Sequence, residues 1–217
     1  MGYRVIDLDT FPRKKHLVFF SAMQTPYVGA TVEVDATDFM AARRAAGLPF
    51  FLSFLYCVGR AANGVPALRQ RLTDGRLIEM DACRFSYTVL LPDGTYGYCQ
   101  ADCGMPFDLY LPEAVRRHAE AKAHPSLADG EDMNGYIFIF CLPWLHYASV
   151  QQPTPFPADT IPRIVWGKYE ENDRGRITLP VTLLANHALV DGLHISQFFD
   201  GLNRELAAFA RERRPSV

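Results

Sequence analysis

The segment that most constrains the fold is an apolar run, ITLPVTLLA, at residues 177–185. Apolar residues occupy both alternating sets of positions, which is typical of a strand that is covered on both faces. A polar turn, NHALVDG, follows, and residues 193–210 then repeat apolar side chains at helical spacing. These apolar positions are Ile195, Phe198, Phe199, Leu202, Leu206 and Phe209. The pattern predicts a central strand followed by an amphipathic helix.

Strands and helices also alternate irregularly through the rest of the chain. Residues 28–37 have strand periodicity, and residues 38–46 predict a short helix capped by Thr37 and closed by Gly47. Further expected elements are a buried helix at 50–64, a short helix and then a strand around a turn at Asp74-Gly75, and a hairpin at 84–101. They are followed by a helix at 112–123, a strand at 136–150 and a hairpin at 161–188 with its turn at 172–175. Hairpins with interspersed helices predict an α+β layered fold, and we expect a single domain over residues 1–217.

The composition excludes several classes of protein. The chain has 217 residues, 49% of them hydrophobic, with a formal net charge of −2, so it has no basic surface of the kind that binds nucleic acid. No apolar run approaches the roughly 20 residues that span a membrane. The five cysteines are irregularly spaced, and only Cys99 and Cys103 resemble half of a metal site. We therefore expect a cytoplasmic protein with reduced thiols and no bound metal.

One histidine, His187, lies at the carboxyl end of the predicted central strand. An imidazole that is partly shielded from water there can stay neutral at pH 7 and keep one nitrogen free to accept a proton. The same spacing also suits a histidine that is simply hydrogen-bonded within a turn. Asp191 is expected to cap the helix that follows.

The chain resembles the chloramphenicol acetyltransferases along almost its whole length. The resemblance includes NHALVDG with the helix after it, the early segment YRVIDLDTFPRKKHLVFF, LPWLHYASV around Trp144, and the strand VWGKYE. It implies a two-layer mixed sheet with helices, and an acetyltransferase that moves an acetyl group directly from acetyl-CoA, with no tightly bound cofactor. In this reading His187 is the general base, and Asp191 is structural support paired with Arg13.

The resemblance also implies the surroundings of the base. The family is a homotrimer with active sites between subunits, and chloramphenicol is the default acceptor, which gives antibiotic resistance. Lys168 and Tyr169 are expected to bind the coenzyme. A hydrogen-bond donor to the oxyanion is expected near Trp144, and either His146 or Ser149 is suited to this role. The aromatic side chains proposed to line the acceptor pocket are Phe19, Tyr27, Tyr136, Phe138 and Tyr147.

Three features depart from the family pattern and leave alternatives open. Asn186 replaces a histidine, Val165 replaces a threonine, and the oxyanion donor is not at its usual place. A relative that binds CoA or another ligand without turnover is one alternative, and an enzyme with a different acceptor is another. A detached acyltransferase domain of a 2-oxoacid dehydrogenase complex fits less well, because the chain has no lipoyl or linker region.

Overall fold

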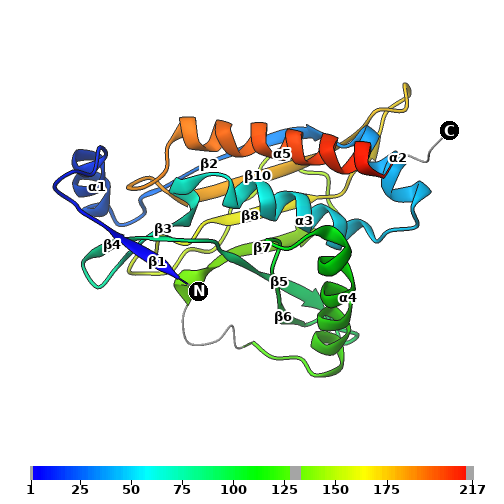
Figure 1. Cartoon of the computed structure of the whole chain (residues 1–217), viewed down its shortest axis with the longest axis horizontal. Coiled ribbons are helices and arrows are strands. Elements are labelled where there is room, and N and C mark those ends of the chain that lie inside the picture. Colours follow the sequence, from blue (N-terminus) through cyan, green and yellow to red (C-terminus); the bar gives the residue numbers. More distant parts are fainter. Residues whose placement is uncertain (1, 128–132, 214–217) are drawn as a thin grey trace.

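The main sheet is mixed, and β10 is an interior strand next to the β2 edge. The computed structural model describes residues 2–127 and 133–213. In this part of the chain the strand order is β2-β10-β8-β7-β5-β6, and β9 pairs with β10 beside this path (Figure 1). The strands are β2 (Tyr27–Asp35), β5 (Arg84–Leu90), β6 (Tyr96–Ala101), β7 (Tyr136–Leu142), β8 (Arg163–Gly167), β9 (Glu170–Glu171) and β10 (Ile177–Asn186). Because β10 pairs with β2 on one side and β8 on the other, and most of its side chains are buried, the predicted central strand is confirmed.

The sheet opens between two of its strands. The parallel pairing of β5 with β7 runs from Arg84 opposite Tyr136 to Tyr87 opposite Ile139 and ends there. Beyond this point β5 stays paired with β6 as far as Leu90, and β7 stays paired with β8 as far as Leu142. The two halves of the sheet therefore separate at their far ends, and the residues that follow Tyr87 and Ile139 border a gap.

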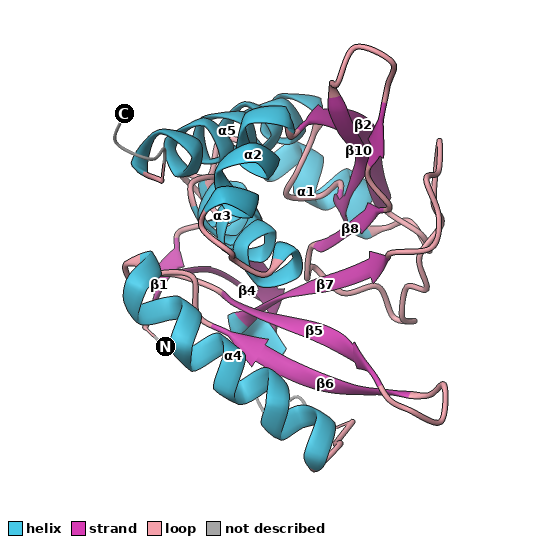
Figure 2. Cartoon of the chain, turned by 90° about the vertical axis from the view of Figure 1, so that its right-hand side faces the viewer, coloured by secondary structure: helices cyan, strands magenta, loops and turns pink. Residues whose placement is uncertain are grey.

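The helices form the second layer. Figure 2 shows them on one side of the main sheet. They are α2 (Thr37–Ala45), α3 (Phe50–Asn63), α4 (Phe107–Ala123) and α5 (Gly192–Glu212), while α1 (Lys14–Ser21) lies at one end of the molecule (Figure 1). All six apolar positions predicted for the last helix are buried. Helix α3 approaches β5 so closely that a Cβ on Gly59 would lie 2.8 Å from the Phe85 ring, and 2.6 Å from the sulfur of Cys103, which follows β6. The expected α+β, two-layer arrangement is confirmed.

Three predicted local features are wrong. Thr37 does not cap α2, because its N–H and hydroxyl both donate to Asp35, and its oxygen also accepts from the Ile177 N–H. Helix α4 begins at Phe107 and includes Pro112, since Phe107, Tyr110 and Ala114 bury one helical stripe that extends before the proline. The charged pattern of residues 112–123 also predicts an exposed His118, but this side chain on α4 is half-buried and stacks on Tyr87.

The short helix predicted before Asp74-Gly75 is largely replaced by a hairpin. Strands β3 (Gln70–Thr73) and β4 (Arg76–Met80) pair with β1 (Tyr3–Ile6) in a small second sheet, and only a short 3-10 turn (Pro66–Arg69) precedes them. Asp74 and Gly75 both have positive φ, which is the turn geometry that suits two antiparallel strands. The turn at Asp74-Gly75 was predicted correctly. The residues just before it, which were expected to be helical, instead form strand β3 and pair with β4.

A buried arginine ties this small sheet to the main one. The Arg71 guanidinium is fully buried and donates to the carbonyls of Leu68, Gln70 and Tyr136 at 2.7–2.9 Å, and to the Cys83 sulfur at 3.4 Å. Burial lowers the pKa of Arg71, because no carboxylate bonds to the buried charge within the described chain. Three carbonyl oxygens and the Cys83 sulfur therefore hold this cation.

We expect Arg71→Met to lower the free energy of unfolding by about 2–5 kcal/mol, because three buried carbonyls lose their donor. Urea unfolding monitored by fluorescence measures the loss. Arg116→Met on the exposed face of α4, where Arg116 pairs with Glu113 and Glu120, is the control and should cost less than about 1 kcal/mol. Equal, small losses for both variants would contradict the assigned role of Arg71.

No helix in the described ranges is both long and apolar enough to cross a membrane.

Candidate active site

His187 immediately follows the last residue of β10. Its backbone N–H donates to the Pro26 carbonyl at 2.7 Å, and its ring stacks on Phe20 of α1 with 3.9 Å between ring centroids. Its Nδ1 lies 2.8 Å from the Val190 carbonyl oxygen. Because a carbonyl can only accept, Nδ1 carries the proton of the neutral ring and Nε2 keeps its lone pair. The turn therefore fixes the tautomer in which Nε2 is free to act as a base.

Asp191 and Arg13 brace this turn. Arg13 forms an ion pair with Asp191 through NH1 and Oδ2, and its NH2 donates to the His187 carbonyl at 3.3 Å. The predicted pair is thus present and joins the segment before α1 to the residues around the histidine. The side chains are 16% and 31% exposed, so the pair is only partly shielded from water.

Asp191 also begins α5, as predicted. Its Oδ1 accepts from the Leu193 N–H at 3.0 Å, and His194 returns a contact, with Nδ1 3.1 Å from the Asp191 N–H. Burial would raise the pKa of Asp191, but the nearby charge of Arg13 and the hydrogen bonds from Arg13 and the Leu193 N–H outweigh it and lower that pKa. Burial lowers the pKa of His194, which favours the neutral ring that accepts from the backbone. Asp191 therefore stays ionised at neutral pH, and its stabilising effect is lost only as the pH falls below about 3.8.

Asp191→Asn isolates the ion pair, because asparagine is also a good N-cap and keeps the acceptor for Leu193. We expect it to lower the free energy of unfolding by about 1.5–3 kcal/mol, the usual range for a hydrogen bond to a charged group, since the pair is too exposed to cost more. Arg13→Met should cost a similar amount. If urea titrations give losses below about 0.5 kcal/mol for both variants, the ion pair does not hold the turn.

A second polar network lies beside the first. Arg163, which is 5% exposed, donates from NH1 and NH2 to the Asp159 carboxylate at 2.9 and 2.7 Å. The Tyr27 hydroxyl lies 3.3 Å from the same carboxylate, and burial raises the pKa of Tyr27. Asn186 donates to the Asp159 carbonyl and accepts from the Ala188 N–H. Asn186 thus shapes the turn around His187, and Asp159 and Arg163 are site residues that the sequence analysis missed.

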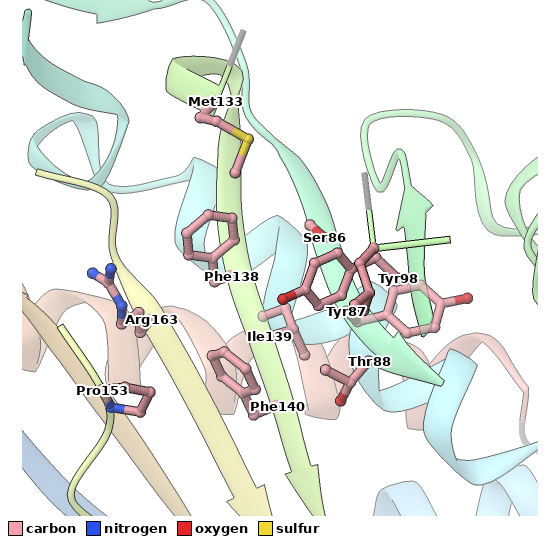
Figure 3. A pocket seen from close by; sticks show the side chains of 11 residues that line it. Ser86, Tyr87, Thr88, Tyr98, Met133, Phe138, Ile139, Phe140, Pro153 and Arg163 are labelled. Carbon is pink, nitrogen blue, oxygen red and sulfur yellow. The ribbon is translucent and has the colours of Figure 1, made fainter. Parts of the chain in front are cut away.

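Two cavities lie on either side of the gap between β5 and β7. The first, here called the sheet-face cavity, has a volume of about 460 Å³ and is shown in Figure 3. Its lining includes the aromatic side chains Tyr87, Tyr98, Phe138 and Phe140, together with Thr88 and Arg163. The second, here called the helix-end cavity, has a volume of about 570 Å³ between the start of α3, α4 and the ends of β7 and β8. Its lining includes Phe51, His118, Lys122, Trp144, Lys168 and Tyr169.

The model of the chloramphenicol acetyltransferase family matches residues 1–203. The chain belongs to this family. It is 24% identical over 209 residues to chloramphenicol acetyltransferase 3 of Escherichia coli, with 93% of this chain and 96% of the relative covered. A relative from Klebsiella sp is 23% identical, with 94% and 93% covered. The structural comparison gives a TM-score of 0.81 and 25% identity to a solved chloramphenicol acetyltransferase, covering 94% of this chain and all of that one.

The fold is shared more widely. A probable dihydrolipoamide acetyltransferase from Listeria monocytogenes superposes with a TM-score of 0.68 at 18% identity, covering 94% of this chain and 93% of that one. With the family match, this identifies the chain as an acyltransferase with the fold of the CoA-dependent enzymes.

Some predicted site residues border the cavities of this acyltransferase, and others do not. Phe138 lines the sheet-face cavity, while Lys168 and Tyr169 line the helix-end cavity. Tyr136 is buried in the core, and Phe19 is 62% exposed on α1. The Tyr147 hydroxyl donates to the Val165 carbonyl and accepts from Thr182, so it belongs to a hydrogen-bonded chain on the sheet.

Of the two residues proposed as oxyanion donors, His146 lies away from the His187 of its own chain, and neither lines either of the two cavities. His146 has Nδ1 3.0 Å from the Lys168 carbonyl and Nε2 3.4 Å from Glu33, while Ser149 is exposed. Glu33 pairs with Pro180, seven residues before His187, which is roughly 20 Å along a strand. Within one chain, therefore, His187 is separated from His146 and from the helix-end cavity.

Proposed function

We propose that this acyltransferase moves an acetyl group from acetyl-CoA to a hydroxyl, with chloramphenicol as the first acceptor to test. The observation that carries the proposal is the hydrogen bond from His187 Nδ1 to the Val190 carbonyl, which leaves Nε2 as a fixed proton acceptor. The ring cannot turn this nitrogen away without losing both that bond and its stacking on Phe20.

The reaction we propose is a direct transfer. Nε2 of His187 takes the proton of the acceptor hydroxyl while the oxygen attacks the thioester carbonyl. The tetrahedral oxyanion then collapses, the carbon–sulfur bond breaks, and the leaving sulfur receives the proton from the imidazolium. Arg13 and Asp191 take no part in proton transfer. They hold the histidine in position before the substrates bind, so that little conformational entropy is lost when the site forms.

The helix-end cavity is the coenzyme site in this proposal. Lys122, His118 and Lys168 line it, and none of its lining residues within the described chain is acidic, so it suits the phosphates of CoA. Trp144 and Tyr169 offer aromatic surfaces for the coenzyme's apolar parts. The sheet-face cavity, whose lining combines aromatic and aliphatic side chains with Thr88 and Arg163, is the acceptor site.

We propose further that each active site combines two copies of the chain, in a homotrimer. His187 lines neither cavity within the described chain, so the base needs a cavity from elsewhere. Large apolar side chains next to the histidine are exposed, as expected of a surface that a partner covers. They are Val18 (64%), Phe19 (62%), Met23 (43%) and Leu193 (65%).

Product analysis by mass spectrometry tests the activity. Purified protein with acetyl-CoA and chloramphenicol should give the acetylated drug and free CoA, and a panel of other alcohols and amines extends the search for acceptors. The alternative is a relative that binds CoA without turnover, favoured by the displaced oxyanion donor. Calorimetric binding of CoA with no acetylated product from any acceptor would support that alternative.

A further inference from the structure

Thr88 on β5 is the one residue shared by the linings of the two cavities within the described chain. It lies one position beyond Tyr87, where the pairing of β5 with β7 ends. Figure 3 shows it beside Phe140 of β7, facing the gap between the two strands. Two ligands that enter from the two cavities would therefore meet next to this side chain.

The Thr88 hydroxyl is available to a ligand. It makes no hydrogen bond to any described residue, and its side chain is neither fully buried nor fully exposed. Neighbouring hydroxyls are engaged: Tyr87 lies 3.3 Å from His118 Nδ1, while Ser86 and Tyr98 have partners of their own. Phe140, the β7 residue beside it, offers no polar atom. The point where the two cavities meet, here called the junction, thus offers the Thr88 hydroxyl to a ligand beside the apolar ring of Phe140.

We infer that Thr88 is a catalytic residue whose hydroxyl donates a hydrogen bond to the oxyanion of the tetrahedral intermediate. The inference rests on the proposed function and supplies an oxyanion donor at the point where the two cavities meet, since neither His146 nor Ser149 lines either cavity. Negative charge develops on the thioester oxygen where the acetyl group passes from the coenzyme to the acceptor. A hydroxyl at this point stabilises that charge in the transition state more than it stabilises the bound thioester.

The test compares Thr88→Val with the wild-type enzyme. Valine matches threonine in shape but has no hydroxyl, so we expect kcat to fall by about 10²–10³, the usual cost of losing one oxyanion donor. The KM values for acetyl-CoA and for the acceptor should change less than about threefold, because the interaction forms in the transition state. Thr88→Ser keeps the hydroxyl and should recover most of the rate. Thr73→Val, in the small second sheet, controls for loss of a threonine hydroxyl elsewhere.

The outcomes separate this inference from the proposed function. Wild-type turnover together with an unchanged kcat in Thr88→Val would overturn the role of Thr88 and leave the acetyl transfer intact. A rise in the dissociation constant for CoA that accounts for the whole loss would also overturn it, since Thr88 would then serve binding. Absence of turnover in the wild-type protein with every acceptor, despite CoA binding, would remove both.

Discussion

Replacing His187 with glutamine should lower kcat by about 10²–10⁴, the usual contribution of a positioned general base. Glutamine can still donate to the Val190 carbonyl, but it has no nitrogen basic enough to take the acceptor proton. The KM for acetyl-CoA should change little, because the base acts on the acceptor hydroxyl in the transition state and does not hold the bound coenzyme. Steady-state kinetics of CoA release, with thermal unfolding as a check on folding, measure both effects.

His124→Gln is the matched control for this substitution. His124 is exposed at the end of α4, so its loss should leave kcat unchanged. A His187→Gln enzyme that retains more than about a tenth of the wild-type rate would show that the histidine has only a structural role in its turn. The general base would then be unassigned, and His187 would be a histidine that is simply hydrogen-bonded within its turn.

Two inactive variants should restore activity to each other when they share a trimer. A chain with His187→Gln keeps its cavities, and a chain with Thr88→Trp keeps its histidine but fills the point where both cavities meet. If the base and the cavities of each site come from different copies, trimers that contain both chains should have about a third of wild-type activity, because one of their three sites combines the intact halves.

Co-expression of the two chains with different affinity tags provides the measurement. Tandem purification selects mixed assemblies, and their CoA release is compared with that of each variant purified alone in the same way. A rate in the mixed assemblies no higher than in the separate variants would contradict a site shared between copies, provided that the tags show both chains to be present.

The sequence predicted the elements whose buried side chains follow a regular apolar pattern. The apolar run at residues 177–185 predicted an interior strand, because a strand with apolar side chains on both faces must be covered on both. The helical spacing of apolar residues after it predicted α5. The Arg13–Asp191 pair came from the resemblance rather than from any local pattern, since its partners are 178 residues apart in the chain. Contacts of that kind leave no periodic signal in a single sequence.

Residues that depend on tertiary placement were harder to predict. Thr88 lies in an ordinary hairpin strand, and only the end of the β5–β7 pairing makes it a junction between two cavities. Asp159 and Arg163 looked like loop and strand residues, yet together they hold Tyr27 and the turn around Asn186. His146 was chosen by its position near Trp144, and the structure instead places it against Glu33 and the Lys168 carbonyl.

The most direct test of the central claim is the rate of thiol release from acetyl-CoA, measured with and without chloramphenicol for the wild-type and His187→Gln proteins side by side. We predict release that requires the drug in the wild-type protein and falls by about 10²–10⁴ in the variant, because the acetyl group passes to a hydroxyl that His187 deprotonates. Drug-dependent release that is equal in the two proteins would contradict the role of His187. No release with chloramphenicol or with any alcohol or amine acceptor would contradict the transfer itself.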